Sequence, residues 1–214
     1  MSLKTASFLL CISILVTLVS GFERVDAPRA HDKVCLGTDN GFSYPGPQVH
    51  YDRFRSRYRD CTYVSGNLEI THMSRYIASD LSFLSTIEVV TGYVLIGLVT
   101  VDTIPLHSLR VIGGDNTFEI MGGNRALAVV MCDGLQELQM PSLQEISKGT
   151  VIFYRNPLLM FVNTINWDTI VLEKNNPAVI ATGGVSESES HCSAACDIDG
   201  VKRCWAHGDN MCQI

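Results

Sequence analysis

GNLEIT at residues 66–71 is the first of five short β-type segments that decide the fold, and each has turn residues beside it. The other four are YVLIG at 93–97, LRVI at 109–112, ALAVV at 126–130 and TVIFY at 150–154. The predicted strands start at Leu68, Val94, Val111, Leu127 and Val151, so successive starts are 26, 17, 16 and 24 residues apart. Short strands at an uneven spacing of roughly twenty residues are typical of a solenoid whose coils differ in length.

The residues between these segments carry leucine and isoleucine anchors, which stacked coils would bury as one continuous column. We therefore predict a mainly β fold, namely a right-handed β-helix or solenoid of the leucine-rich-repeat type. Residues 48–60 are predicted to form a short capping helix at the N-terminal end, because His50, Phe54 and Tyr58 recur every four residues. Four arginines at alternate positions fan around this helix, and we interpret them as a solvated surface: Arg53, Arg55, Arg57 and Arg59.

The composition excludes several classes of protein. The chain has 214 residues, 46% of them hydrophobic, with 16 Lys and Arg against 22 Asp and Glu. That length suffices for one sizeable domain and a small appendage. The net charge of −6 disfavours a nucleic-acid-binding protein, which would carry a basic domain. No catalytic triad, P-loop or metal motif occurs in the sequence, so we expect neither an enzyme nor a bound cofactor or metal.

Residues 1–21 have the layout of a secretory signal peptide, with one early lysine, an apolar run and then small residues. The alternative is a membrane anchor, but the uncharged stretch from 5 to 22 has only 18 residues, which is marginal for a span. Every later apolar run is broken within about ten residues, so we expect no other membrane span. We predict a secreted, extracellular protein.

Cleavage would remove Cys11 and leave seven cysteines in a compartment that favours disulfides. Six of them can pair, but spacing alone leaves the pairing undetermined: Cys35, Cys61, Cys192, Cys196, Cys204 and Cys212. A zinc site that combines the terminal cluster with His191 and His207 is the alternative, and a secreted chain disfavours it. The seventh, Cys132, is either buried and inert or a free thiol that links two chains.

Several blocks resemble the first receptor L domain of the epidermal growth factor receptor family. They are VCLGT at 34–38, YRDC at 58–61, GNLEIT at 66–71, LSFL at 81–84, VTGYVLI at 90–96, IPL at 104–106, ALAV at 126–129 and LQEI at 143–146. Asn156-Pro157, Trp167 and Cys204-Trp205 extend the match into the cysteine-rich domain that follows in the family. The resemblance covers roughly residues 34–212 in collinear order.

Residues 22–33 are predicted to be a flexible lead-in. The resemblance implies a receptor L domain at 34–185 and a single furin-like cysteine-rich module at 186–214. It also implies three disulfides, Cys35–Cys61, Cys192–Cys204 and Cys196–Cys212, and a Trp205 that wedges into the L domain. One further family bridge is missing, because its two positions are Met160 and Glu189 here. We expect residues 186–190 to be looser for that reason.

In this family the first L domain holds a growth factor by backbone pairing along a loop and a strand edge, which is β-augmentation. Carried across by motif, the ligand-binding residues are Asn40, Phe42, Tyr44 and Gly46 in the loop, and His72, Leu98, Val130 and Met131 at the strand ends. His72 stands where an aromatic residue is usual, and Tyr44-Pro45 replaces a more flexible polar pair. The identity of the ligand therefore stays open.

The implied partner is an epidermal-growth-factor-like ligand or a receptor of the same family. Our first hypothesis is a secreted, kinase-less decoy that sequesters the growth factor. Avidity from a Cys132-linked homodimer would then offset the missing half of the receptor's binding site. The alternatives are a module that docks on a receptor or matrix partner, and a truncated or spliced receptor product without separate activity.

Overall fold

The structure, a computed structural model, describes residues 27–78, 80–174, 178–181 and 191–214. The predicted signal peptide and the segment 186–190 lie outside these ranges. The described chain is mainly β, as the sequence predicts, and most of its strands are two to five residues long. Within the same ranges, no helix combines the length and the hydrophobicity that a bilayer crossing requires.

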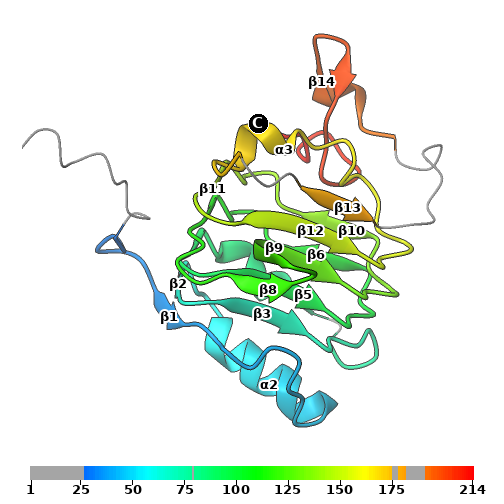
Figure 1. The fold of residues 1–214 in the computed structure, drawn as a ribbon. Helices are drawn as coiled ribbons and strands as arrows, with labels where there is room; N and C mark the ends of the chain where they lie inside the picture. The colour runs from blue at the N-terminus through cyan, green and yellow to red at the C-terminus, as the bar shows by residue number, and fades with distance from the viewer. Residues whose placement is uncertain (1–26, 79, 175–177, 182–190) are drawn as a thin grey trace, which may run out of the picture.

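Two parallel sheets and one parallel strand pair carry the fold (Figure 1). The first sheet, in spatial order, is β1 (Val34–Leu36), β2 (Tyr63–Ser65), β4 (Val89–Val90), β7 (Val111–Ile112) and β11 (Glu145–Ile146). The large sheet is β13 (Val179–Ala181), β12 (Thr150–Tyr154), β9 (Gly123–Val130), β5 (Val94–Gly97) and β3 (Leu68–Thr71). The strand pair is β6 (Thr103–Pro105) with β10 (Glu137–Gln139).

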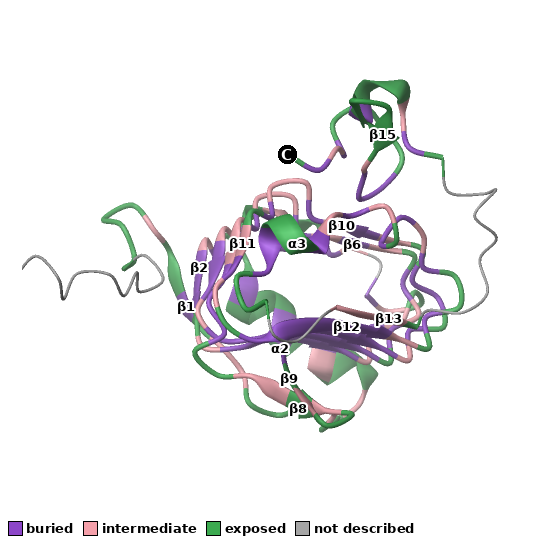
Figure 2. Ribbon diagram, turned by 45° about the horizontal axis from the view of Figure 1, so that its top comes forward, coloured by how far each residue is buried: buried purple, intermediate pink, exposed green. Residues whose placement is uncertain are grey.

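Along the sequence, the chain passes repeatedly from the first sheet to the large sheet and, in the later coils, through the strand pair before it returns to the first sheet. After β2 and β3 it passes through the short 3-10 helix η1 (Ser82–Thr86) to β4 and β5, and then through β6 to β7 and β9. β10 leads in the same way to β11 and β12. Figure 2 shows β2 and β11, β6 and β10, and β12 and β13 on three sides of one interior. Stacked parallel strands are what a solenoid requires, and the right-handedness of the coil stays a prediction.

Pairing within the large sheet gives the length of each coil. Leu68 lies opposite Val94, Val94 opposite Leu127, and Leu127 opposite Val151, so successive coils are 26, 33 and 24 residues long. The expectation that 109–112 is the next strand of this series is wrong, because Val111 pairs with Val89 in the first sheet. The middle coil is longer because it also contains β8 (Phe118–Ile120), which pairs antiparallel with the start of β9 and is the sixth strand of the large sheet, off the parallel path (Figure 2).

One apolar cluster fills the interior along the coil. Inward-facing strand residues such as Ile70 and Ile96 supply part of it. The leucine and isoleucine anchors at or between the five predicted segments supply much of the rest, and these are fully buried: Leu84, Ile87, Ile104, Leu106, Leu109, Leu135, Leu138 and Ile146. Because each buried leucine or isoleucine contributes about 1.5–3 kcal/mol, this column is the main source of stability.

Helix α2 (Pro47–Tyr58) closes the N-terminal end of the coil beside β3 (Figure 1). Pro47 occupies the first turn, where a missing N–H costs no helical hydrogen bond, and Gly46 before it has a φ of 108°. The helix is one residue longer at its start and two shorter at its end than predicted. Its buried side chains are Tyr51, Phe54 and Tyr58.

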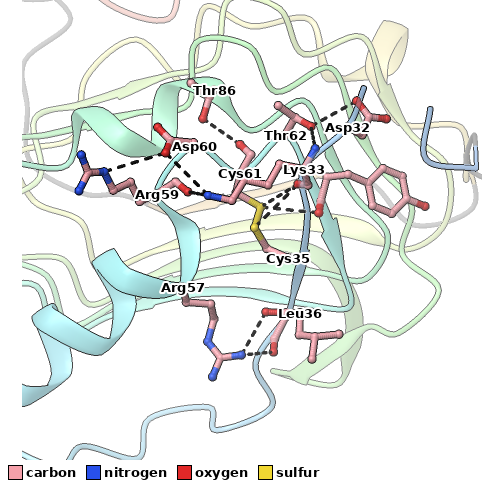
Figure 3. Close-up of a disulfide and its surroundings, with 12 residues drawn as sticks. Asp32, Lys33, Cys35, Leu36, Arg57, Arg59, Asp60, Cys61, Thr62 and Thr86 are labelled. Carbon is pink, nitrogen blue, oxygen red and sulfur yellow. Dashed lines mark hydrogen bonds and ion pairs between the residues drawn. A yellow bond between two sulfur atoms is a disulfide. The ribbon is translucent and has the colours of Figure 1, made fainter. Parts of the chain in front are cut away.

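The Cys35–Cys61 disulfide ties β1 to the end of α2 (Figure 3). Beside it, Thr86 Oγ1 donates a hydrogen bond of 2.8 Å to the carbonyl oxygen of Cys61. Arg57 Nη1 of the helix donates to the carbonyl oxygen of Leu36 at 3.2 Å. The bridge and these bonds fix where the chain leaves β1, and therefore where the loop 38–46 begins.

The described part of the N-terminal segment, residues 27–33, contacts the first sheet. The Arg29 guanidinium binds the carboxylates of Asp32 and Glu88. The backbone N–H of Lys33 donates to Thr62 Oγ1 at 3.0 Å. This part of the predicted flexible segment is therefore anchored to the coil.

Residues 191–214 form a small module with two interleaved disulfides, Cys192–Cys204 and Cys196–Cys212. It contains the 3-10 turn η2 (Ala194–Cys196) and the hairpin of β14 (Asp197–Ile198) and β15 (Val201–Lys202). Asp199 and Gly200 between these strands both have positive φ, as a tight two-residue hairpin turn requires. All three disulfides in the described chain are the pairs that the resemblance implies.

Trp205 joins this module to the coil. Its side chain is 1% exposed and meets the ring of Trp167 edge to face, with centroids 5.5 Å apart. Trp167 begins helix α3 (Trp167–Ile170) and packs in turn on Phe153 of β12 at 5.3 Å. The side-chain amide of Gln213 accepts from the N–H of Asn166 at 2.8 Å and donates to its carbonyl oxygen at 3.0 Å. The boundaries 34–185 and 186–214 stay predictions.

Candidate functional site

The large sheet has a second apolar side that faces away from the core. Alternate strand residues form it, and we call this set the outer face: Tyr93, Leu95, Ala128, Val130 and Ile152. Partly buried side chains cover it, including Phe42 from the loop, Phe118 from β8, and Met131 and Tyr154 at strand ends. The five outer-face residues are at most 5% exposed, so they form a second, smaller apolar cluster, and its partly buried covering residues lie nearest the surface.

Four residues with left-handed backbone form a column at one corner of the coil. Each directly follows a strand of the large sheet, and their φ values lie between 53° and 55°: His72, Leu98, Met131 and Arg155. Their N–H groups bond along the column, for instance from Leu98 to the carbonyl oxygen of Val130 at 3.2 Å. Left-handed backbone is unfavourable for such side chains, and strain of this kind gathers at functional sites. We call these four residues the left-handed column.

The loop 38–46 lies beside the first strand of the large sheet, and Glu69 holds it there. The two carboxylate oxygens of Glu69 accept from the N–H groups of Asn40 at 2.7 Å and Gly41 at 2.8 Å. Glu69 also accepts from the hydroxyl of Tyr93 at 2.8 Å. Burial and this carboxylate raise the pKa of Tyr93. A buried carboxylate with several donors is fully hydrogen-bonded, so the loop position is well determined.

Phe42 extends the outer face from the loop. Its ring lies so close to Gly97 that a Cβ there would come within 2.5 Å of Phe42 Cε1. It also meets Phe118 edge to face, with centroids 6.0 Å apart. Gly97 is therefore the residue that lets a loop aromatic ring lie against the end of β5.

Tyr44 lies over two histidines at the base of the column. Its ring stacks on His72 with centroids 4.5 Å apart and meets His50 at 5.7 Å. The pKa of His72 is lowered, first because burial penalises the charged imidazole and then because His50 is near. His50 Nε2 bonds the carbonyl oxygen of Thr71 at 2.7 Å. The three rings form one aromatic cluster at the edge of the sheet.

The structure brings most of the predicted ligand-binding residues to one region. Phe42 and Met131 lie at the outer face, Tyr44 is 43% exposed over His72, and Leu98 is 37% exposed. Asn40 and Gly46 belong to the same loop, where Asn40 donates to Glu69 and Gly46 precedes α2. Val130 is the exception: its side chain is fully buried within the outer-face cluster, so it supports the surface from below and does not offer a direct contact.

Sequence reasoning missed Arg155 and Tyr154, which extend the site toward β13. Arg155 completes the left-handed column, and its Cζ lies 5.3 Å from the ring centroid of Tyr154. Tyr154 belongs to the outer-face cluster. The sequence position of Arg155 could have identified it, because Arg155 follows the segment 150–154 just as Met131 follows the segment 126–130.

Cys132 directly follows Met131, but its thiol lies in the interior. The residue has no exposed surface and is unpaired. Its Sγ lies 3.3 Å from the carbonyl oxygen of Val130, and its N–H donates to Asn156 Oδ1 at 3.1 Å. A second chain has no access to this sulfur, so of the two alternatives the structure supports the buried thiol and gives the Cys132-linked homodimer no support.

The Cys132 thiol should therefore resist reagents in the folded protein. Burial raises its pKa to about 11, so little of the reactive thiolate exists at pH 8. We expect a maleimide to label no cysteine of the native mature chain, and to label one in urea without reductant. Mass spectrometry counts the adducts. Rapid labelling of the native chain, or a covalent dimer that reductant dissolves, would contradict this placement.

No group of three or more metal-ligating side chains occurs among the residues that the structure describes. The four terminal cysteines that could have formed a zinc site with His191 and His207 are paired in disulfides. His207 instead bonds Glu137 Oε1 through Nδ1 at 2.6 Å, and this contact helps to lower the pKa of Glu137 against the opposing effect of burial.

Comparison with known protein families identifies a match for this architecture. The model of the receptor L domain matches residues 60–171, which include most strands of both parallel sheets. This chain belongs to the receptor L domain family.

Relatives of this chain include receptor tyrosine-protein kinases and an epidermal growth factor receptor. The chain is 38% identical over 209 residues to the melanoma receptor tyrosine-protein kinase of Xiphophorus maculatus, covering 92% of this chain and 17% of that protein. It is 35% identical to human receptor tyrosine-protein kinase erbB-4, covering 87% and 14%. It is 33% identical to the epidermal growth factor receptor of Drosophila melanogaster, covering 85% and 13%. The chain thus spans less than a fifth of the length of these relatives.

Proposed function

We propose that this receptor L domain binds an epidermal-growth-factor-like protein through the loop 38–46, the left-handed column and the adjoining outer face. The observation that carries the proposal is the column itself, since it aligns exposed Leu98, half-buried Met131 and His72 along one edge next to the loop. These positions are the ones that the resemblance to the epidermal growth factor receptor family assigns to ligand contact.

The chemistry of this surface suits a protein strand. Apolar side chains line the edge, and aromatic rings of Phe42 and Tyr44 flank it from the loop. An extended segment of a partner can pair with the loop backbone while its side chains contact the apolar column, which is the β-augmentation mode of recognition. Aromatic residues at such a surface commonly contribute a large share of the binding energy.

Released from a cell as the sequence predicts, the protein would hold growth factor away from a complete receptor. A single L domain supplies only part of a two-domain binding site. If a complete receptor binds near nanomolar, about −12 kcal/mol, half of that free energy corresponds to a Kd of roughly 10⁻⁴ to 10⁻⁵ M. With Cys132 buried, disulfide-linked avidity does not supplement this affinity, so a decoy role requires a ligand that this edge fits closely.

Binding of the mature chain to a panel of epidermal-growth-factor-like proteins tests the proposal. We expect at least one Kd at or below about 100 μM. Leu98→Glu should abolish that binding, because it places a carboxylate in the apolar column. Leu172→Glu is the matched control, since Leu172 is 53% exposed and bonds through its N–H to β11 in the other sheet. No binding up to about 100 μM across the panel would refute the proposal.

A further inference from the structure

An open groove lies between the loop 38–46, helix α2 and β3, and its volume is about 540 Å³. The loop contributes Tyr44, the helix contributes His50 and Phe54, and β3 contributes Thr71. Arg53 and Arg57 complete the wall on the helix side. We call this cavity the arginine groove. It adjoins the proposed binding edge, because Tyr44 forms part of its wall while stacking on His72 of the column.

The arginines of α2 do not share one environment. Arg53 and Arg57 lie four residues apart, on the side of the helix that faces the groove. Arg55 points elsewhere, toward Asp80, with Nη2 3.5 Å from Oδ2. All four arginines are exposed, as the sequence predicts, but Arg53 and Arg57 also line the groove beside the loop.

The groove carries exposed positive charge on an acidic protein. Arg57 is oriented by the carbonyl oxygens of Leu36 and Gly37, and its side chain is exposed, as is that of Arg53. The one carboxylate in the wall, Glu69, is buried and already accepts from Asn40, Gly41 and Tyr93. The charges accessible from the groove are thus guanidinium groups, although the chain as a whole has a net charge of −6.

We propose that the arginine groove binds an acidic side chain of the protein ligand, next to the segment that pairs with the loop. This inference rests on the proposed function, and it adds that the ligand carries Asp or Glu at this point. A guanidinium offers paired donors that match the two oxygens of a carboxylate. The rings of Tyr44, His50 and Phe54 supply apolar walls for the methylene groups of such a side chain.

The dimensions of the site favour a peptide over an anionic polysaccharide. Two arginines set in a groove with aromatic walls present a short, confined positive site. Polysaccharide chains are typically bound by longer clusters of basic residues on an open surface. Arg55 and Arg59, which would be needed to lengthen the cluster, lie near Asp80 and Asp60 respectively.

Charge reversal in the groove is the first arm of the test. With a growth factor that binds the mature chain, we expect Arg53→Gln to weaken binding about two- to fivefold and Arg53→Glu roughly tenfold, with smaller effects in high salt. Arg55→Glu is the matched control, because it makes the same change on the same helix outside the groove. Substituting Lys for the responsible acidic residue of the growth factor should restore binding to Arg53→Glu.

The second arm does not need a growth factor. The probe is an acetylated, amidated peptide in which Glu alternates with Tyr, and its control replaces each Glu by Gln. The readout is the NMR resonance of the Arg53 Nε–H group in the mature chain. We expect the Glu peptide to shift this resonance at millimolar concentration and the Gln peptide to leave it unchanged, with heparin as a third titrant.

The outcomes separate this inference from the proposed function. Growth-factor binding that Leu98→Glu abolishes but Arg53→Glu leaves intact would overturn the groove inference and keep the function. Absence of growth-factor binding together with a shift by the Glu peptide would overturn the function and keep an acidic-peptide site. No shift by the Glu peptide, or a shift by heparin alone, would overturn the groove inference.

Discussion

Trp205→Ala is expected to lower the free energy of unfolding by about 3–5 kcal/mol, the usual cost of deleting a fully buried tryptophan. Trp205 lies at the end of a chain of rings that runs through Trp167 to Phe153 of the large sheet. Removing it leaves a cavity between the coil and the C-terminal module. We expect the module to detach and the last coil, with α3, to lose its cover.

Urea denaturation followed by circular dichroism measures this loss, and limited proteolysis that separates residues 191–214 from the coil reports release of the module. Trp205→Phe is the control, because a smaller ring still fills most of the space. Its indole N–H has no hydrogen-bond partner in the described structure, so Phe loses no bond there. A Trp205→Ala protein with wild-type stability and a protected module would show that the tryptophan is not what joins the two parts.

The second large effect is expected from removing the Cys35–Cys61 disulfide. The bridge closes a loop with a sequence separation of 26, for which the chain-entropy estimate is about 3–4 kcal/mol. We expect the double substitution Cys35→Ser with Cys61→Ser to lower stability by that amount. Because the closed loop contains the residues 38–46 and α2, the same change should also weaken growth-factor binding.

Fluorescence distinguishes local from global damage in this variant. The sequence has two tryptophans, Trp167 and Trp205, whose rings are in contact. Trp167 begins α3, which lies at the end of the coil opposite α2 (Figure 1). We expect their emission to stay native in dilute buffer and to change at a lower urea concentration than in the wild type. An unchanged urea midpoint, with growth-factor binding intact, would contradict a stabilising role for the bridge.

The strand segments were predictable because each combines β-type residues with a turn signal within a few positions. The sheet to which a segment belongs was not predictable from spacing. Val111 and Leu127 both begin short apolar segments, yet Val111 pairs with Val89 and Leu127 with Val94. Each coil contributes one strand to each of two sheets, and local sequence does not distinguish their faces when both are buried.

The location of the candidate site was predictable from the sequence, but the burial of its individual side chains was not. Motif positions located the loop and the strand ends, whereas the burial of Val130 depends on side chains from other segments that cover the outer face. The surroundings of Arg53 likewise depend on side chains from other segments. Its neighbours come from a loop about ten residues earlier in the sequence and from β3, so a helix considered alone gives only a solvated surface.

The left-handed column also sets a spacing rule for any partner. Neighbouring strands lie about 4.8 Å apart, so the column presents one side chain at about that interval. A partner strand running along it repeats its side chains on one face about every 6.7 Å. Two such steps nearly equal three steps of the column, so the two series coincide only at its ends, His72 and Arg155. Side chains of the partner would therefore be in register with His72 and Arg155, while Leu98 and Met131 would contact the partner between those two positions.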